Sequence, residues 1–129
     1  GTQKKRTKSI RQLIKILDKS YSIFVRRQNS DKDGFAACFT CKIKKPWKEL
    51  QLGHYISRRH TNTRFEPINT APQCVSCNIF KHGSLDEYAL RLQSKYGEGI
   101  LKELHTLKNQ TKQWTVKELE ELIKKYESL

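Results

Sequence analysis

The chain has 129 residues, of which 26 are Lys or Arg and 13 are Asp or Glu, so its formal net charge is +13. This length suits one domain spanning residues 1–129, and no segment approaches the roughly 20 apolar residues that a membrane-spanning helix requires. So large a basic excess disfavours an enzyme of small neutral metabolites and is typical of proteins that bind nucleic acid.

The positive charge is concentrated near the beginning of the chain. Residues 1–30 contain nine basic residues and one acidic residue, whereas residues 61–129 are nearly neutral. Apolar residues at spacings of three and four over residues 9–28 predict an amphipathic helix. We interpret residues 1–30 as a basic helical arm that contacts DNA phosphates, the alternative being lysines that only keep the chain soluble. The contacts expected from this arm are Arg11, Lys15, Arg26 and Arg27.

The next segments predict a loop over residues 29–34 and then a small β-hairpin. Residues 35–39 are predicted as a short strand, and residues 50–56, which alternate weakly, as its partner. A basic turn over residues 42–48 would separate the two strands. Residues 57–67 predict a polar, Arg-rich loop.

Helices are predicted for the rest of the chain. One covers about residues 75–81 and is stopped by Gly83. The capping boxes Ser84–Glu87 and Thr115–Glu118 predict the starts of two further helices, and another covers about residues 100–108. We expect residues 84–129 to be helical support for the preceding part of the chain.

Four cysteines form two C-x-x-C pairs with 32 residues between them. The first pair is Cys38 and Cys41, and the second pair is Cys74 and Cys77. Two such pairs can complete a tetrahedral four-cysteine site, so we predict a structural Zn²⁺ whose binding energy stabilises the middle of the chain. Two disulfides or a redox motif are the alternatives, but nothing marks the chain as secreted and a secreted scaffold of this size usually has more cysteines.

Polar side chains between and after the cysteine pairs predict a reactive site. His54 lies in the second predicted strand, Asn69 in the loop, and Asn78 directly after the last cysteine. His82 follows Asn78 by four residues, so on a helix the two would share a face and could hold one Mg²⁺ or Mn²⁺ ion. Basic residues suited to a phosphodiester surround them, and we favour phosphate contacts over the alternative that they are only solvated: Arg58, Arg59, Arg64 and Lys81.

The pattern of His54, Asn69 and Asn78 between two C-x-x-C pairs resembles the HNH, or ββα-metal, nuclease superfamily. Over roughly residues 35–105 the chain is similar to the NinG (Rap) family of phage recombination proteins. The residues that carry this similarity are Gly53-His54-Tyr55-Ile56-Ser57-Arg58, Arg64-Phe65, Asn69, Gln73-Cys74-Val75-Ser76-Cys77-Asn78 and Gly83.

The resemblance implies roles for individual residues. His54 would be the general base that takes a proton from the attacking water, and Asn78 a ligand of Mg²⁺ or Mn²⁺. Asn69 would pin the loop and orient His54 through a hydrogen bond. The products would carry a 5′-phosphate and a 3′-hydroxyl, and the substrates would be branched DNA such as Holliday junctions and D-loops.

One position departs from the superfamily pattern. Many HNH nucleases have Asp or His immediately before the base, whereas this chain has Gly53, which offers no ligand. We expect His82 to complete the ligand set, with a carboxylate such as Glu66 or Asp86 as the alternative.

The expected fold is therefore α+β, with a small zinc-stabilised ββα-metal (HNH) core over residues 35–83 flanked by α-helices at both ends. The expected function is a metal-dependent endonuclease on branched DNA in phage recombination, in the cytoplasm of a bacterial host, with phage or host recombination proteins as partners. The alternatives are a zinc-stabilised DNA-binding module without cleavage and an HNH nicking or restriction-type nuclease on linear duplex. The apolar stripes of the first and last helices are expected to form core, or else a homodimer interface.

Overall fold

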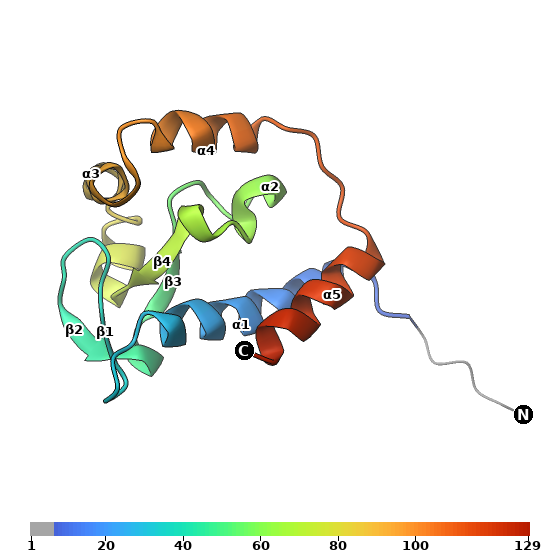
Figure 1. The fold of residues 1–129 in the computed structure, drawn as a ribbon, viewed down its shortest axis with the longest axis horizontal. Coiled ribbons are helices and arrows are strands. Elements are labelled where there is room, and N and C mark those ends of the chain that lie inside the picture. The colour runs from blue at the N-terminus through green and yellow to red at the C-terminus, as the bar shows by residue number, and fades with distance from the viewer. Residues whose placement is uncertain (1–6) are drawn as a thin grey trace, which may run out of the picture.

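The computed structural model describes residues 7–129 and shows a mixed α+β chain with two small antiparallel hairpins (Figure 1). Three short helical segments are not α-helical: the 3-10 helices η1 (Trp47–Glu49) and η2 (Pro67–Asn69) and the π-helix η3 (Ser76–Phe80). No helix in residues 7–129 is both long and apolar enough to cross a membrane. The elements in chain order are α1 (Ile10–Gln28), β1 (Phe35–Ala37), β2 (Lys44–Pro46), η1 (Trp47–Glu49), β3 (Gln51–His54), α2 (Thr61–Arg64), η2 (Pro67–Asn69), β4 (Thr70–Gln73), η3 (Ser76–Phe80), α3 (Leu85–Tyr96), α4 (Ile100–Lys108) and α5 (Val116–Glu127).

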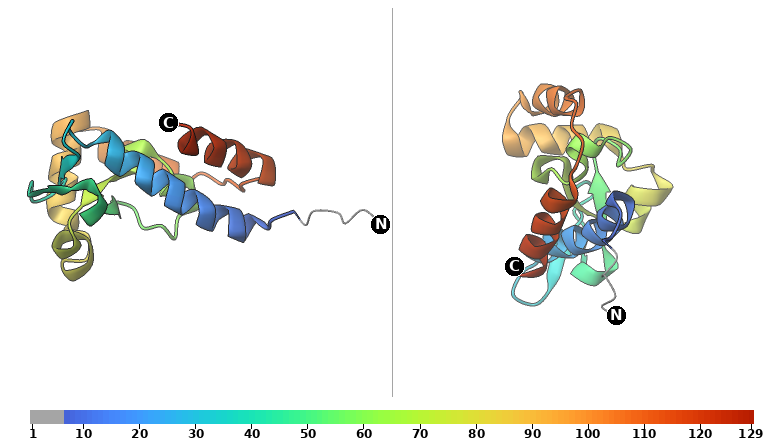
Figure 2. Two further views of the ribbon diagram at one scale, coloured as in Figure 1. Left: turned by 90° about the horizontal axis from the view of Figure 1, so that it is seen from below. Right: turned by 90° about the vertical axis from the view of Figure 1, so that its right-hand side faces the viewer.

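The predicted N-terminal helix is confirmed from residue 10 as α1. Ser9 caps it: its hydroxyl accepts from the Gln12 amide, and the Gln12 side chain accepts from the Ser9 amide. The apolar stripe of α1 packs against α5, which lies beside it in all three views (Figures 1 and 2). The Tyr21 and Tyr126 rings meet edge to face at 5.0 Å between centroids. Both stripes therefore form core, as expected.

The predicted hairpin between residues 35–39 and 50–56 is wrong. The first cysteine pair lies in a tight turn that reverses the chain within residues 38–43. In this turn the Cys38 amide donates to the Ile43 carbonyl, and Lys42 adopts a left-handed backbone with φ 69°. The segment that follows pairs with β1 as β2, so the predicted basic turn contains a strand. β3 pairs instead with β4, and His54 lies opposite Thr70.

The β3–β4 hairpin lies between α1 on one side and α3 with α4 on the other (Figure 1). All four residues of β4 are buried. The Tyr21 hydroxyl bonds to Thr70 Oγ1 at 2.7 Å from the α1 side. From the α3 side, the Tyr88 hydroxyl donates to the carbonyls of Gly53 at 3.3 Å and Asn69 at 3.4 Å. These contacts hold the end of β3, where His54 lies.

The helices after the second cysteine pair follow the prediction with two differences. The segment predicted as a helix over residues 75–81 is the short π-helix η3, and Gly83 follows it with φ 92°. The capping box at Ser84 is wrong, because Ser84 has a left-handed backbone and its side chain makes no cap hydrogen bond. The capping box at Thr115 is confirmed.

Candidate functional site

The four-cysteine cluster joins two turns that are far apart in the sequence. The first cysteine pair lies between β1 and β2, and the second lies between β4 and η3. All four cysteines are free, and their Sγ atoms lie within 4.8 Å of one another. Tetrahedral Zn²⁺ with Zn–S bonds near 2.3 Å places sulfurs about 3.8 Å apart, and Cys41 Sγ lies 3.7 Å from Cys74 Sγ. The donor set therefore fits a structural zinc ion.

The surroundings of the cluster favour one thiolate. Burial by itself raises the pKa of Cys38. The Cys41 amide and the Thr40 hydroxyl donate hydrogen bonds to its sulfur, and hydrogen bonds of this kind outweigh burial and lower the pKa of Cys38 to about 6. Burial raises the pKa of Cys74. Further thiolates thus require a compensating cation, which is the chemistry of a metal-binding thiol cluster.

A groove of about 760 Å³ lies between α1 and the surface formed by β3 and η3. We call it the His54 groove. Nine of the residues that line it are polar or charged: Lys15, Asp18, Lys19, Ser22, Arg26, Gln51, His54, Arg58 and Asn78. The structure thus brings His54, Asn78 and three of the expected phosphate contacts to one surface.

His54 is held as a neutral imidazole. Its Nε2 lies 2.9 Å from the Arg64 carbonyl oxygen, which can only accept, so Nε2 carries the proton and Nδ1 keeps a free lone pair. Burial lowers the pKa of His54 to about 4, and the charge of Arg58 contributes in the same direction. At neutral pH the side chain is therefore an unprotonated base.

Asn69 is fully buried and holds the loop beside His54. Its Oδ1 accepts from the Ile56 amide at 2.8 Å, and its Nδ2 donates to the carbonyls of Ile56 and Thr63, each at 3.0 Å. The expected hydrogen bond from Asn69 to His54 is absent from these contacts. Asn69 positions His54 indirectly, because it fixes the residue preceding Arg64, whose carbonyl binds the imidazole.

Asn78 and Asp18 are two of the groove residues that carry oxygen atoms suited to a divalent ion. Asn78 Nδ2 donates to Gln51 Oε1 at 2.8 Å, which leaves Asn78 Oδ1 available as a ligand. Asp18, on α1, was not predicted as a site residue. It pairs with Arg64, whose Nε lies 2.9 Å from Asp18 Oδ1, while Arg64 Nη1 donates to the Arg58 carbonyl at 3.2 Å. The only signal in the sequence was that Asp18 is the single acid within a basic segment.

Several predicted residues lie outside the His54 groove. His82 is exposed in a left-handed turn with φ 51°, and because η3 ends at Phe80 the helical face it was expected to share with Asn78 does not form. The carboxylates of Glu66 and Asp86 do not line the groove either. The remaining predicted contacts outside it are Arg11, Arg27, Arg59, Arg64 and Lys81.

Gly53 is required by packing rather than by backbone conformation. A Cβ at this position would lie 2.0 Å from Gln73 Oε1. Gln73 is fully buried, and its Nε2 donates to the Gly83 carbonyl at 2.8 Å and to Thr40 Oγ1 at 3.2 Å. Gln73 therefore connects the first cysteine pair to the end of the η3 segment, and its side chain occupies the space that a metal ligand before His54 would need.

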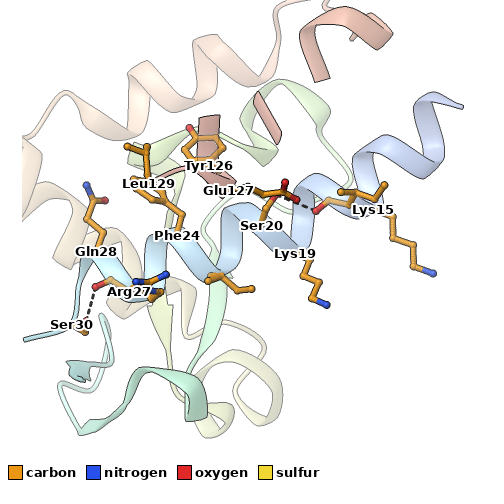
Figure 3. A pocket seen from close by; sticks show the side chains of 12 residues that line it. Lys15, Lys19, Ser20, Phe24, Arg27, Gln28, Ser30, Tyr126, Glu127 and Leu129 are labelled. Carbon is orange, nitrogen blue, oxygen red and sulfur yellow. Dashed lines mark hydrogen bonds between the residues drawn. The ribbon is translucent and has the colours of Figure 1, made fainter. Parts of the chain in front are cut away.

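A second groove, of about 1030 Å³, lies between α1 and the end of the chain. Figure 3 shows Lys15, Lys19, Phe24 and Arg27 on α1, and Tyr126 and Leu129 near the end of the chain. Phe24, Tyr126 and Leu129 contribute to the apolar part of the groove. It contains no histidine or cysteine. It therefore offers basic and apolar surface with one carboxylate, Glu127, and lacks the imidazole of the His54 groove.

Comparisons with known proteins agree on one family. A family model described as "Bacteriophage Lambda NinG protein" matches residues 2–129. The chain is 28% identical over 115 residues to "Protein ninG" of Escherichia phage 933W, a match that covers 88% of the chain and 54% of that protein. It is 27% identical over 115 residues to "Protein ninG" of Escherichia phage lambda, covering 88% of the chain and 53% of that protein. The chain thus spans about half the length of the curated relatives it matches, and no solved structure matches it.

Proposed function

Because the chain belongs to the bacteriophage lambda NinG family, we propose that it is a metal-dependent endonuclease of the HNH type that cuts branched DNA, such as Holliday junctions and D-loops, in phage recombination. The observation that carries the proposal is the His54 groove. It combines a neutral histidine whose Nδ1 is free, an amide oxygen on Asn78 and the basic side chains of Lys15 and Arg58. A general base beside phosphate contacts is what phosphodiester hydrolysis requires.

The order of elements around the groove supports the HNH interpretation. His54 ends β3, Asn69 precedes β4, and Asn78 lies in η3 directly after the second cysteine pair. Two antiparallel strands followed by a short helix are the arrangement that the name ββα-metal describes. The four-cysteine cluster holds β4 and η3 to the first hairpin and so fixes Asn78 relative to His54.

In the proposed reaction His54 Nδ1 takes a proton from the attacking water, whose oxygen bonds to phosphorus as the bond to the 3′ oxygen breaks. The leaving 3′ oxygen takes a proton from solvent. The Arg64 carbonyl keeps Nε2 protonated and the ring oriented while the imidazolium forms. Lys15 and Arg58 contact the phosphate oxygens on which negative charge develops. Asn78 Oδ1 would hold the divalent ion, because Mg²⁺ usually keeps several waters and binds substrate phosphate as well as protein oxygen. When bound, the ion would neutralise charge at the scissile phosphate.

Cleavage of a labelled four-way junction and a matched linear duplex tests the proposal. We expect Mg²⁺ or Mn²⁺ to support cutting of the junction, with no cutting when the divalent ion is omitted. His54→Ala is expected to bind the junction normally and to cut at least about 10²-fold more slowly, since it loses the general base. His105→Ala is the matched control, because His105 is exposed and its imidazole bonds only to Asn109.

One observation favours the non-catalytic alternative, a zinc-stabilised DNA-binding module. The carboxylate of Asp18 is already paired with Arg64, so the described groove offers one unengaged oxygen ligand, Asn78 Oδ1. Tight junction binding without cutting by any divalent ion would establish this alternative. Sequence-specific cutting of linear duplex would instead indicate a restriction-type nuclease.

A further inference from the structure

An exposed apolar ridge borders the His54 groove. It is formed by Val75, Ile79 and Phe80, whose side chains are 39%, 52% and 76% exposed. Phe80 is the most exposed large hydrophobic residue among residues 7–129. Burial of an aromatic side chain is strongly favourable, so one held this far into solvent indicates contact with a ligand or a partner.

The apolar ridge is held firmly in its exposed position. Cys77, on the opposite side of the same short helix, is 3% exposed and belongs to the four-cysteine cluster. The Lys81 amide donates to the Ser76 carbonyl at 2.9 Å, and the Gly83 amide donates to the Cys77 carbonyl at 2.8 Å. In both views of Figure 2 this yellow segment projects from the body of the molecule. The ridge is therefore a fixed projection rather than a frayed end.

The charges beside the apolar ridge specify what can lie on it. Ile79 lines the His54 groove together with Lys15, Lys19, Arg26 and Arg58. The single acidic residue in that lining, Asp18, is neutralised by its ion pair with Arg64. A polyanion seated in the groove would thus pass beside the ridge, and the flat ring of Phe80 would meet whatever apolar surface the polyanion presents. In DNA that surface is the face of a base.

We propose that Phe80 stacks on a base at the branch point of DNA, where the helical stack is interrupted, and thereby selects branched over linear substrate. This inference rests on the proposed DNA-cutting function. Apolar side chains are used in this way to enter between base steps. Unstacking a base from intact duplex costs free energy, and that cost is smaller at a branch point, where stacking is already interrupted. Stacking of one base on an aromatic side chain changes affinity by about 5- to 150-fold. The ridge would therefore tighten binding to a junction much more than binding to duplex.

The test uses the full chain without added Mg²⁺ or Mn²⁺, so that binding is measured apart from cutting. A four-way junction and a linear duplex each carry 2-aminopurine, in the junction at the branch point. We expect the wild-type protein to quench the branch-point fluorescence by stacking. Phe80→Ala is expected to abolish the quenching and to weaken junction binding by at least about 5-fold, with duplex affinity unchanged. Phe80→Trp should preserve both signals.

Leu90→Ala is the matched control, because Leu90 is 61% exposed on α3 and does not line the groove. It should leave quenching and junction affinity unchanged. Junction affinity and quenching that survive Phe80→Ala would overturn the inference. So would a dimer, detected by sedimentation, that Phe80→Ala converts to monomer without affecting quenching, since the ridge would then bind a second copy. Normal quenching by a protein that never cuts DNA would support the role of Phe80 and refute only the nuclease function.

Discussion

His54 acquires its chemistry from its surroundings rather than from its residue type. An ordinary histidine titrates near pH 6.5, whereas burial lowers the pKa of His54 to about 4. The pH dependence of kcat/KM reports ionisations of the free enzyme. We therefore expect kcat/KM for junction cleavage to stay level as the pH falls from 7 to 5 and to drop only near pH 4. An acid limb centred near pH 6.5 would contradict a buried, neutral base.

The same pKa difference predicts how stability depends on pH. Between about pH 6.5 and 4 the unfolded chain binds the His54 proton and the folded chain does not, so stability is greatest above pH 6.5 and falls as the pH is lowered through this window. The difference corresponds to about 3 kcal/mol at most. His54→Gln can still donate to the Arg64 carbonyl but cannot titrate. We expect urea unfolding to show that His54→Gln loses less unfolding free energy between pH 7 and 4 than the wild-type protein does. The control His105→Gln should lose as much as the wild type.

Gly53 provides a steric test of the packing behind His54. Gly53→Ala would place its Cβ against the buried amide of Gln73, so we expect a loss of about 1–3 kcal/mol in unfolding free energy. Combining it with Gln73→Ala should cost less than the sum of the two single changes, because the clash is removed. Gly99→Ala is the control, since a Cβ there meets nothing within 4 Å and its φ is −77°. Additive effects in the double variant would refute the steric explanation.

At the scale of single elements, two similar sequences start helices in different ways. Thr115 has an extended backbone and accepts from the Glu118 amide at 3.1 Å, whereas Ser84 has φ 48° and makes no such bond. The reason lies outside α3. The carbonyl of Gly83 is bound by Gln73, and the residues from His82 to Ser84 are all left-handed. That turn holds Ser84 in a conformation from which its hydroxyl does not cap the helix.

This difference predicts unequal effects of removing the two hydroxyls. We expect Thr115→Ala to lower the free energy of unfolding by about 1 kcal/mol, the usual contribution of an N-cap. Ser84→Ala should change it by no more than a few tenths, because no cap hydrogen bond is lost. Chemical denaturation of both variants measures the comparison. Equal losses would show that Ser84 caps α3 in solution.

At the scale of the whole molecule, the described core divides into three apolar clusters, and one of them contains sulfur. Cys38, Cys74 and Cys77 pack there with Ala36 and Leu50, and Trp47 packs against them. Trp114 packs instead against the cluster between α1 and α5. A zinc ion bound by the four cysteines would supply folding free energy that this small cluster does not supply by itself.

Two single-tryptophan variants follow the effect of removing the metal. In Trp114→Phe, where Trp47 is the remaining tryptophan, we expect a zinc-selective chelator to shift the emission to the red, because the cluster loosens around it. In Trp47→Phe, where Trp114 remains, the shift should be smaller or need more chelator. Adding Zn²⁺, but not Mg²⁺, should reverse the change. No response of Trp47 to a chelator that removes all zinc would contradict a structural ion at the four cysteines.

The sequence by itself determined the features that depend on neighbouring residues. The periodicity of apolar residues predicted α1 and the stripe of α5, because helical contacts join residues three and four apart. The helix α3 was expected from a capping box that does not form. The spacing within each cysteine pair predicted the four-cysteine cluster, since each pair forms within one turn. Strand pairing was mispredicted for two reasons. The basic composition of residues 42–48 gave no sign of β2, which the tight turn at the first cysteine pair places beside β1. The partner of β3 is β4, which lies farther along the chain.

Only the tertiary structure decided the chemistry of the site. Burial beneath other elements lowers the pKa of His54, and a carbonyl ten residues away fixes its tautomer. The pairing of Asp18 with Arg64 joins residues 46 apart, and the need for glycine at position 53 comes from Gln73 on the facing strand. No local pattern encodes these contacts, because each arises only when separate elements pack together. Residue spacing therefore identified the groups that could react, while packing decided which of them share a groove and in which protonation state.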